Sequence, residues 1–204
     1  MSRTTPEEAF AEAQAAIERG DWDSFFACLD SDDLLRIAEN SLARFLMGGE
    51  TTAPILTALC SEHAVPEERV VVLRTLLQRI AESGRASVSL VGSTEPGAML
   101  QQSLRHKQIV DEYQKALKAM LRAVPELSRF TAALERAMRA AEGGGSVSSK
   151  LLVDEVLEDV SITGTRAWGT RRTASGQSED VGFVRRKGAW YVRVFARRPA
   201  KSRG

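Results

Sequence analysis

The chain has 204 residues, with 28 Lys and Arg against 27 Asp and Glu and a formal net charge of +1. That length can bury a hydrophobic core in one domain, or in one domain with a large insertion. No apolar run approaches the roughly 20 residues that a membrane-spanning helix needs, and the first residues lack the apolar stretch of a signal peptide. We therefore expect a cytoplasmic protein without a membrane partner.

The charges are distributed unevenly along the chain. Residues 1–50 carry 11 acidic and 4 basic side chains, a net charge of −7, whereas residues 155–204 carry 11 basic and 5 acidic side chains, a net charge of +6. We expect the acidic N-terminal helices to lie against a basic C-terminal sheet. This internal pairing predicts no nucleic-acid partner, and we interpret residues 198–204 as a flexible, solvated tail.

Three helices are predicted in the first 50 residues. Residues 5–8 combine a threonine N-cap, a proline at the first helical position and a glutamate at the third, and the helix that they begin ends at Gly20. A short second helix covers residues 21–29. A third keeps its apolar residues at helical spacing from Ser31 until Gly48.

Residues 51–145 are predicted to form a helical insertion. Helical spacing of the apolar residues indicates four pieces, at about residues 55–60, 66–83, 98–123 and 125–142. The alternating run 86–91 leaves a short strand open between the second and third pieces. The glycines of residues 143–146 predict a flexible joint between the helices and the sheet.

Residues 152–197 are predicted to form an antiparallel sheet. Two β-rich runs flank Lys187-Gly188, which is typical of a hairpin with a two-residue loop. Because side chains alternate along a strand, this loop places Arg185 opposite Trp190 and Phe183 opposite Val192.

A preceding hairpin is predicted around a turn at Ser175-Gly176. With this turn Arg171 opposes Asp180 on the outer face and Trp168 opposes Phe183, and Arg172 opposes Glu179. Trp168, Phe183 and Val192 are then expected to form one row across three strands.

A first strand is predicted at residues 158–162. A three-residue connection, residues 163–165 with a left-handed glycine, would keep Val160 and Ile162 on the face of Trp168.

The order of these parts resembles the nuclear-transport-factor-2-like superfamily, also described as cystatin-like or polyketide-cyclase-like. The resemblance covers residues 4–48 and 152–197, and its motifs are Arg19-Gly20-Asp21-Trp22, Phe25-Phe26, and the meander with Gly164–Ala167 and Phe183–Trp190. It implies an α+β fold in which a curved antiparallel sheet wraps around the N-terminal helices to form a cone. The enlarged helical middle departs from the family.

The inward face of this sheet gives the candidate ligand-binding residues. We expect Arg166, Trp168, Phe183, Arg185 and Trp190 to lie there together. A guanidinium stacked on an indole keeps free donors, which would suit an anionic or carboxylate-bearing ligand. The alternative is that both arginines lie at the rim of the sheet and pair with N-terminal acids.

Catalytic and metal-binding residues are not predicted. The family's enzymes place an Asp, His or Tyr inside the cone, and no such residue maps onto the inward face. Cys60 and His63 form one metal-like pair without the further ligands that zinc requires, so no metal and no cofactor are predicted. Cys28 and Cys60 are interpreted as small core residues in a reducing compartment.

The sequence thus predicts a non-catalytic binding domain for a small apolar or anionic molecule or for a protein partner. Two alternatives stay open, a small-molecule isomerase, dehydratase or cyclase of the cone type, and a homodimeric interaction protein that uses residues 51–145 as its contact surface. A polar residue deep in a cavity would favour the enzyme. A sealed core with exposed apolar residues on the insertion would favour the interaction protein.

Overall fold

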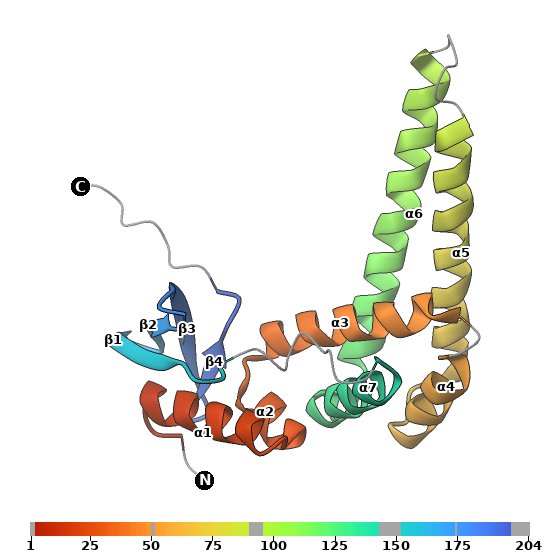
Figure 1. Cartoon of the computed structure of the whole chain (residues 1–204). Coiled ribbons are helices and arrows are strands. Elements are labelled where there is room, and N and C mark those ends of the chain that lie inside the picture. Colours follow the sequence, from red (N-terminus) through yellow and green to blue (C-terminus); the bar gives the residue numbers. More distant parts are fainter. Residues whose placement is uncertain (1–2, 50–51, 90–95, 143–151, 174, 197–204) are drawn as a thin grey trace. The chain divides into compact units, whose positions relative to one another are not determined.

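The computed structural model describes residues 3–49, 52–89, 96–142, 152–173 and 175–196 (Figure 1). In these ranges the chain has seven helices followed by a four-stranded antiparallel sheet, which confirms the predicted α+β class. No helix in them combines the length and the apolar character needed to cross a membrane. The joint predicted at 143–146 and the tail predicted at 198–204 lie outside the described residues.

The contacts divide the chain into two compact units. One comprises Met1–Ile37 and Ser128–Gly204, and the other comprises Ala38–Leu127. We call them the sheet unit and the helical unit. The boundary between them falls within helix α3 (Ser31–Met47), and helix α7 (Leu127–Glu142) belongs to the sheet unit from its second residue onward.

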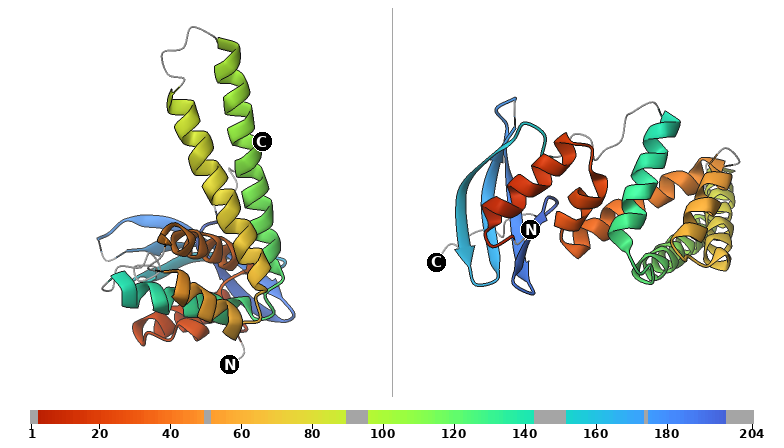
Figure 2. Two further views of the ribbon diagram at one scale, coloured as in Figure 1. Left: turned by 90° about the vertical axis from the view of Figure 1, so that its right-hand side faces the viewer. Right: turned by 90° about the horizontal axis from the view of Figure 1, so that it is seen from below.

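Two N-terminal helices, α1 (Pro6–Glu18) and α2 (Trp22–Cys28), lie against one face of the sheet, as predicted (Figure 2). Helix α1 begins with the expected capping box, in which Thr5 Oγ1 accepts from the Glu8 backbone and the Glu8 carboxylate accepts from the Thr5 backbone. The Asp21 carboxylate caps α2 by accepting a backbone N–H of its first turn.

Helix α7 packs on α2 within the sheet unit. The Arg136 guanidinium forms a 2.7 Å ion pair with Asp23, and the Arg139 guanidinium carbon lies 4.1 Å from the ring centroid of Trp22. Trp22 in turn contacts Phe25 edge to face, with ring centroids 6.0 Å apart.

The sheet has the strand order β1-β2-β3-β4, with strands β1 (Val156–Thr163), β2 (Arg166–Arg172), β3 (Ser178–Arg186) and β4 (Ala189–Arg193). The predicted β3–β4 register is confirmed, since Phe183 opposes Val192 and Arg185 opposes Trp190. Lys187 and Gly188 both have positive φ, 49° and 86°, as a type I′ turn requires.

The predicted β2–β3 register is wrong by one residue. Ala167, rather than Trp168, opposes Phe183, and Arg171 opposes Glu179 rather than Asp180; Arg172 opposes Ser178. Ser178 rather than Glu179 closes the loop opposite Arg172. Inside this pair, the Thr173 N–H donates to the Gln177 carbonyl at 2.8 Å and Gly176 adopts φ 80°. A slip of one residue exchanges the two faces of a strand. Trp168 therefore lies on the face opposite to Phe183, and the predicted row of Trp168, Phe183 and Val192 does not form.

The first strand is longer than predicted and joins β2 differently. Thr163 pairs with Arg166 across a two-residue Gly164-Thr165 turn with Gly164 at φ 61°, whereas a three-residue connection was expected. A bulge between Glu158 and Ser161 shifts the register once more, with Asp159 at φ 52°.

These shifts place Leu157, Val160 and Ile162 on the face of Phe183 rather than on the face of Trp168. Ile162 opposes Ala167, and a Cβ added at Gly169 would stand 2.7 Å from the nearest Leu157 methyl carbon and 3.3 Å from one of Val160. The row across the four strands is therefore Ile162, Ala167, Phe183 and Val192. Of these, Ala167, Phe183 and Val192 are buried, as are Phe10, Ala13 and Ile17 of α1.

The outer edge of β4 is covered by the chain's own N-terminal segments. The Asp30 N–H donates to the Val192 carbonyl and the Trp190 N–H donates to the Arg3 carbonyl, both at 2.9 Å. This pairing removes the open hydrogen-bonding groups that an edge strand otherwise exposes.

In the helical unit, a short helix α4 (Ala53–Glu62) precedes a long antiparallel hairpin of α5 (Glu67–Ser89) and α6 (Pro96–Arg122) (Figures 1 and 2). Because α5 continues through Ser89, the strand left open at residues 86–91 does not form over 86–89, and residues 90–91 lie outside the described ranges. The buried residues of α5 and α6 include Leu73, Leu76, Ile109, Tyr113 and Leu117.

Candidate functional site

The structure does not bring the five predicted ligand-binding residues together. Phe183 and Trp190 are 1% and 3% exposed and belong to the core, whereas Arg185, on the same face, is exposed at the end of β3. Arg166 and Trp168 lie on the opposite face of the sheet, Arg166 exposed and Trp168 half-buried. Arg166 therefore does not lie beside Trp190, because its expected place depended on the β2–β3 register, whereas Arg185 opposes Trp190 as predicted.

Acidic residues of the N-terminal part do pair with the basic sheet, through arginines other than those expected. The buried carboxylate of Asp30 lies 2.8 Å from Arg186 Nη2 and 3.4 Å from Arg193 Nε. Arg186 Nη1 also donates to Ser31 Oγ at 2.7 Å. The start of α3 is thereby fixed to the β3–β4 hairpin.

A second buried carboxylate lies one turn further along α3. Asp33 Oδ2 accepts from the Phe195 N–H at 3.1 Å, and the Arg36 guanidinium carbon lies 4.7 Å from the Phe195 ring centroid. Burial raises the pKa of Asp33 above its ordinary value of 3.8, partly opposed by the hydrogen bond from Phe195. Asp33 and Asp30 thus both serve contacts within the sheet unit.

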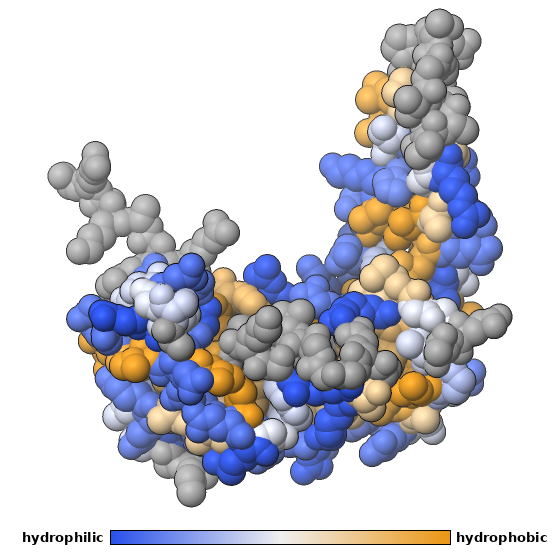
Figure 3. Space-filling view, in the orientation of Figure 1, coloured by the Kyte–Doolittle hydropathy of each residue, from blue (hydrophilic) through white to orange (hydrophobic). Residues whose placement is uncertain are grey.

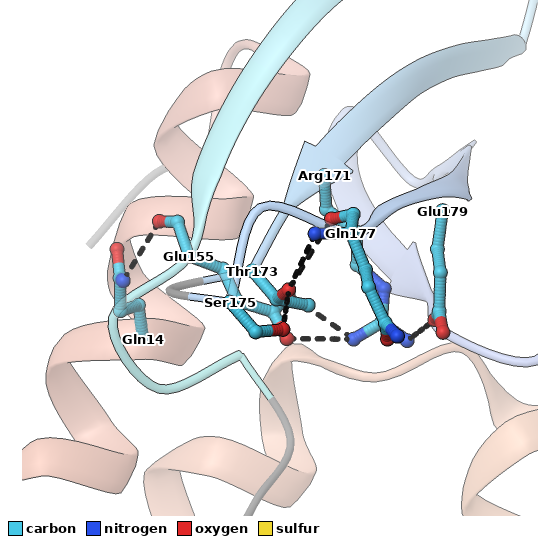
Figure 4. A network of polar contacts seen from close by, with 7 residues as sticks. All are labelled: Gln14, Glu155, Arg171, Thr173, Ser175, Gln177 and Glu179. Atoms are coloured by element: carbon cyan, nitrogen blue, oxygen red, sulfur yellow. Dashed lines mark hydrogen bonds and ion pairs between the residues drawn. The ribbon is translucent and has the colours of Figure 1, made fainter.

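A buried ion-pair network lies where β1 and β2 meet the preceding segment (Figure 4). Arg171 Nη1 is 3.1 Å from both carboxylate oxygens of Glu155, and Arg171 Nη2 pairs closely with Glu179. Gln14 of α1 donates from its side-chain amide to the Glu155 backbone carbonyl at 3.0 Å. Because two carboxylates occupy the Arg171 fork, the network ties chain segments together and offers little to an added anion.

The sequence did not reveal this network. Arg171 was expected on the outer face, but it is buried, because the register slip turns it toward α1. Glu155 precedes β1 and lies outside the first strand that the sequence predicts at residues 158–162. No spacing rule marks Glu155, and only the correct register of β2 would have indicated a buried arginine in need of a partner.

The described parts of the chain contain no assembled nucleophilic or metal-binding site. Burial raises the pKa of the Cys60 thiol to about 11 and also raises that of Cys28, so both are protonated at neutral pH. Over the same residues, no group of three or more His, Cys, Asp and Glu side chains could hold a metal ion.

The surface of the helical unit carries exposed apolar side chains. Figure 3 shows hydrophobic residues among hydrophilic ones along the hairpin. Leu100 and Leu104 of α6 are 63% and 59% exposed, and Val71 and Val72 of α5 are about half exposed. Single exposed apolar residues are ordinary, and several on one helical hairpin make it a candidate contact surface.

Leu100 and Leu104 begin a stripe along α6 that we call the outer stripe. Its residues follow one another at steps of three or four and are all exposed; they are Leu100, Leu104, Lys107, Asp111, Lys115, Lys118 and Arg122. This spacing places them on one side of the helix. The buried residues Ile109, Tyr113 and Leu117 occupy a different side.

Hollows accompany this surface. One of about 330 Å³ lies on the outer stripe, lined by Leu104, Lys107, Gln108, Asp111, Glu112 and Lys115. Another of about 390 Å³ lies between α5 and α6, lined by Glu68, Arg69, Val72, Ala116, Ala119, Met120 and Ala123. A third of about 300 Å³ lies between α4 and α5 beside Cys60 and Arg74.

No protein-family model, no curated protein and no solved structure matches the chain. The resemblance to the nuclear-transport-factor-2-like superfamily therefore stays a prediction.

Proposed function

We propose that the chain is a non-catalytic interaction protein that binds another protein through the α5–α6 hairpin. The observation that carries this proposal is the exposure of Leu100 and Leu104, 63% and 59%, on a long surface helix. Two leucines four residues apart form the kind of ridge by which one helix packs on another. A helical surface of a second protein is thus the occupant that fits.

The sheet unit supports protein binding over small-molecule binding. Phe183 and Trp190, the apolar core of the predicted ligand site, are almost wholly buried by the fold itself. The buried carboxylates Asp30, Asp33 and Glu155 all have partners in the chain. Catalysis of the isomerase, dehydratase or cyclase type remains an alternative prediction with no residue assigned to it.

A photo-crosslinking experiment tests the proposal. A photoreactive amino acid replaces Leu104 in one variant and Thr75, an exposed residue of α5, in a control. We expect a specific adduct in cells from position 104 only. The adduct partner is then purified, and its affinity for the chain should fall at least tenfold in a Leu100→Lys, Leu104→Lys variant, about 1.4 kcal/mol or more.

Three results would contradict the proposal. Equal adducts from positions 104 and 75 would show non-specific collision, and unchanged affinity of the double variant would exclude the leucines from the interface. An adduct between two copies, with dimers in sedimentation, would replace it by the homodimeric alternative.

A further inference from the structure

The outer stripe of α6 changes character along its length. Its first two residues, Leu100 and Leu104, are apolar, whereas its last three, Lys115, Lys118 and Arg122, are all basic and exposed. At 1.5 Å per residue, Leu104 and Lys115 are about 16 Å apart along the helix axis. Across the described ranges of the chain, none of the three cations is in an ion pair or hydrogen bond.

We propose, building on the function above, that the outer stripe binds an acidic amphipathic helix of a different protein. The apolar residues of this helix meet Leu100 and Leu104, and its carboxylates meet Lys115, Lys118 and Arg122. Three cations at steps of three and four match acidic residues at the same steps on a helix lying alongside. The hollow of about 330 Å³ beside Leu104 and Lys115 gives room for side chains between the two ends.

A second copy of the chain supplies too few carboxylates to match this stripe, which carries four cations, Lys107, Lys115, Lys118 and Arg122, and one carboxylate, Asp111. Antiparallel self-pairing about Asp111 would oppose Asp111 to itself and Lys107 to Lys115, and would place Leu104 against Lys118. Parallel self-pairing would oppose every cation to its own copy. Like charges directly opposite destabilise an interface, so the partner must supply carboxylates of its own.

An acidic helix also fits the stripe better than a nucleic acid does. A phosphate backbone needs a run of cations and makes no use of exposed leucines. Here Leu100 and Leu104 form the N-terminal end of the stripe, and Asp111 separates Lys107 from the three cations of the C-terminal end. Nucleic-acid binding is therefore an outcome of the test that contradicts the proposal.

The test measures binding of three synthetic helical peptides to the full chain by fluorescence anisotropy. The first has leucines four residues apart at one end and glutamates spaced to meet the three cations at the other. The second has lysines in place of the glutamates, and the third has the first peptide's composition in scrambled order. We expect the first to bind at least tenfold more tightly than either of the others, with weaker binding at higher salt.

Charge reversal makes the test specific to the stripe. Lys115→Glu, Lys118→Glu, Arg122→Glu should invert the preference toward the lysine peptide. A matched control, Arg85→Glu, Arg105→Glu, reverses exposed cations of the same hairpin that lie off the stripe and should leave the preference unchanged. All five positions are exposed, so circular dichroism and the melting midpoint should confirm intact folding of both variants.

Three outcomes would overturn the inference: equal affinity for the acidic and scrambled peptides, an equal effect of the control reversal, or a DNA duplex that binds the stripe without needing Leu100 and Leu104. If the crosslinked partner from position 104 binds the reversed variant as tightly as the parent chain, the interaction function stands and only the acidic-helix assignment fails.

Discussion

The Arg171 guanidinium donates from Nη1 to both carboxylate oxygens of Glu155, each at 3.1 Å. Their side chains are only 10% and 5% exposed. Because Arg171 comes from β2 and Glu155 from the segment before β1, the pair connects that segment to the sheet. A buried pair of this kind is costly to break, since removing one partner leaves the other charge buried and unpaired.

Replacing Arg171 by alanine should therefore destabilise the chain strongly. We expect a loss of about 3 to 5 kcal/mol in the free energy of unfolding, measured by urea denaturation. Arg172→Ala is the matched control, because the Arg172 side chain is 54% exposed and pairs with Glu158 at the surface. Its loss should be about 0 to 1 kcal/mol. Similar small losses in both variants would contradict the buried role of Arg171.

Phe183 and Trp168, which lie on opposite faces of the sheet, should respond differently to truncation. Phe183→Ala should cost about 3 to 5 kcal/mol, because the ring is fully buried. Trp168→Ala should cost on the order of 1 to 2 kcal/mol, since the half-buried indole lies on the other face and less of its surface leaves water on folding. Thermal unfolding of both variants measures the difference, and a larger loss for Trp168 would contradict the register.

The contrast between the two hairpins shows how far the sequence could predict the sheet. Lys187-Gly188 allows essentially one pairing, because a two-residue loop with positive φ at both positions fixes the register. The loop around Gly176 is longer, and hydrogen bonds between Thr173 and Gln177 set its closing pair. The amino-acid sequence of the loop does not predict these hydrogen bonds. An error of one residue in this pairing was enough to place Arg171 on the wrong face in the prediction.

The sequence analysis named residues 51–145 as an alternative contact surface, but it did not predict which side of α6 is exposed. Helical spacing over residues 98–123 predicts α6, but apolar residues occur at several angles around it. Which side faces α5 is decided by packing, since Ile109 and Tyr113 are buried while Leu104 is not. Spacing alone therefore predicts the helix and leaves its exposed side undetermined.

The two cysteines should be inert in the folded chain. Cys28 and Cys60 are 0% and 3% exposed, and burial raises the pKa of Cys60 to about 11. Since the thiolate is the reactive form, we expect no reaction with a thiol reagent such as DTNB at pH 8 and two equivalents after unfolding in guanidinium. Rapid reaction of either thiol in the folded chain would contradict the burial.

Asp33 should make stability depend on pH in a specific direction. Burial raises its folded-state pKa above the ordinary 3.8, so its contribution is fully present below pH 3.8 and is lost as the pH rises through the folded-state value. Asp33→Asn stays neutral and still accepts the Phe195 N–H, so it should gain stability relative to the parent chain between pH 4 and pH 7. Urea denaturation at both pH values measures this gain, with the exposed Asp32→Asn as the control. The charged neighbours Asp30 and Arg193 are unchanged in both variants, so a gain of Asp33→Asn that is larger at pH 4 than at pH 7 would contradict the raised pKa.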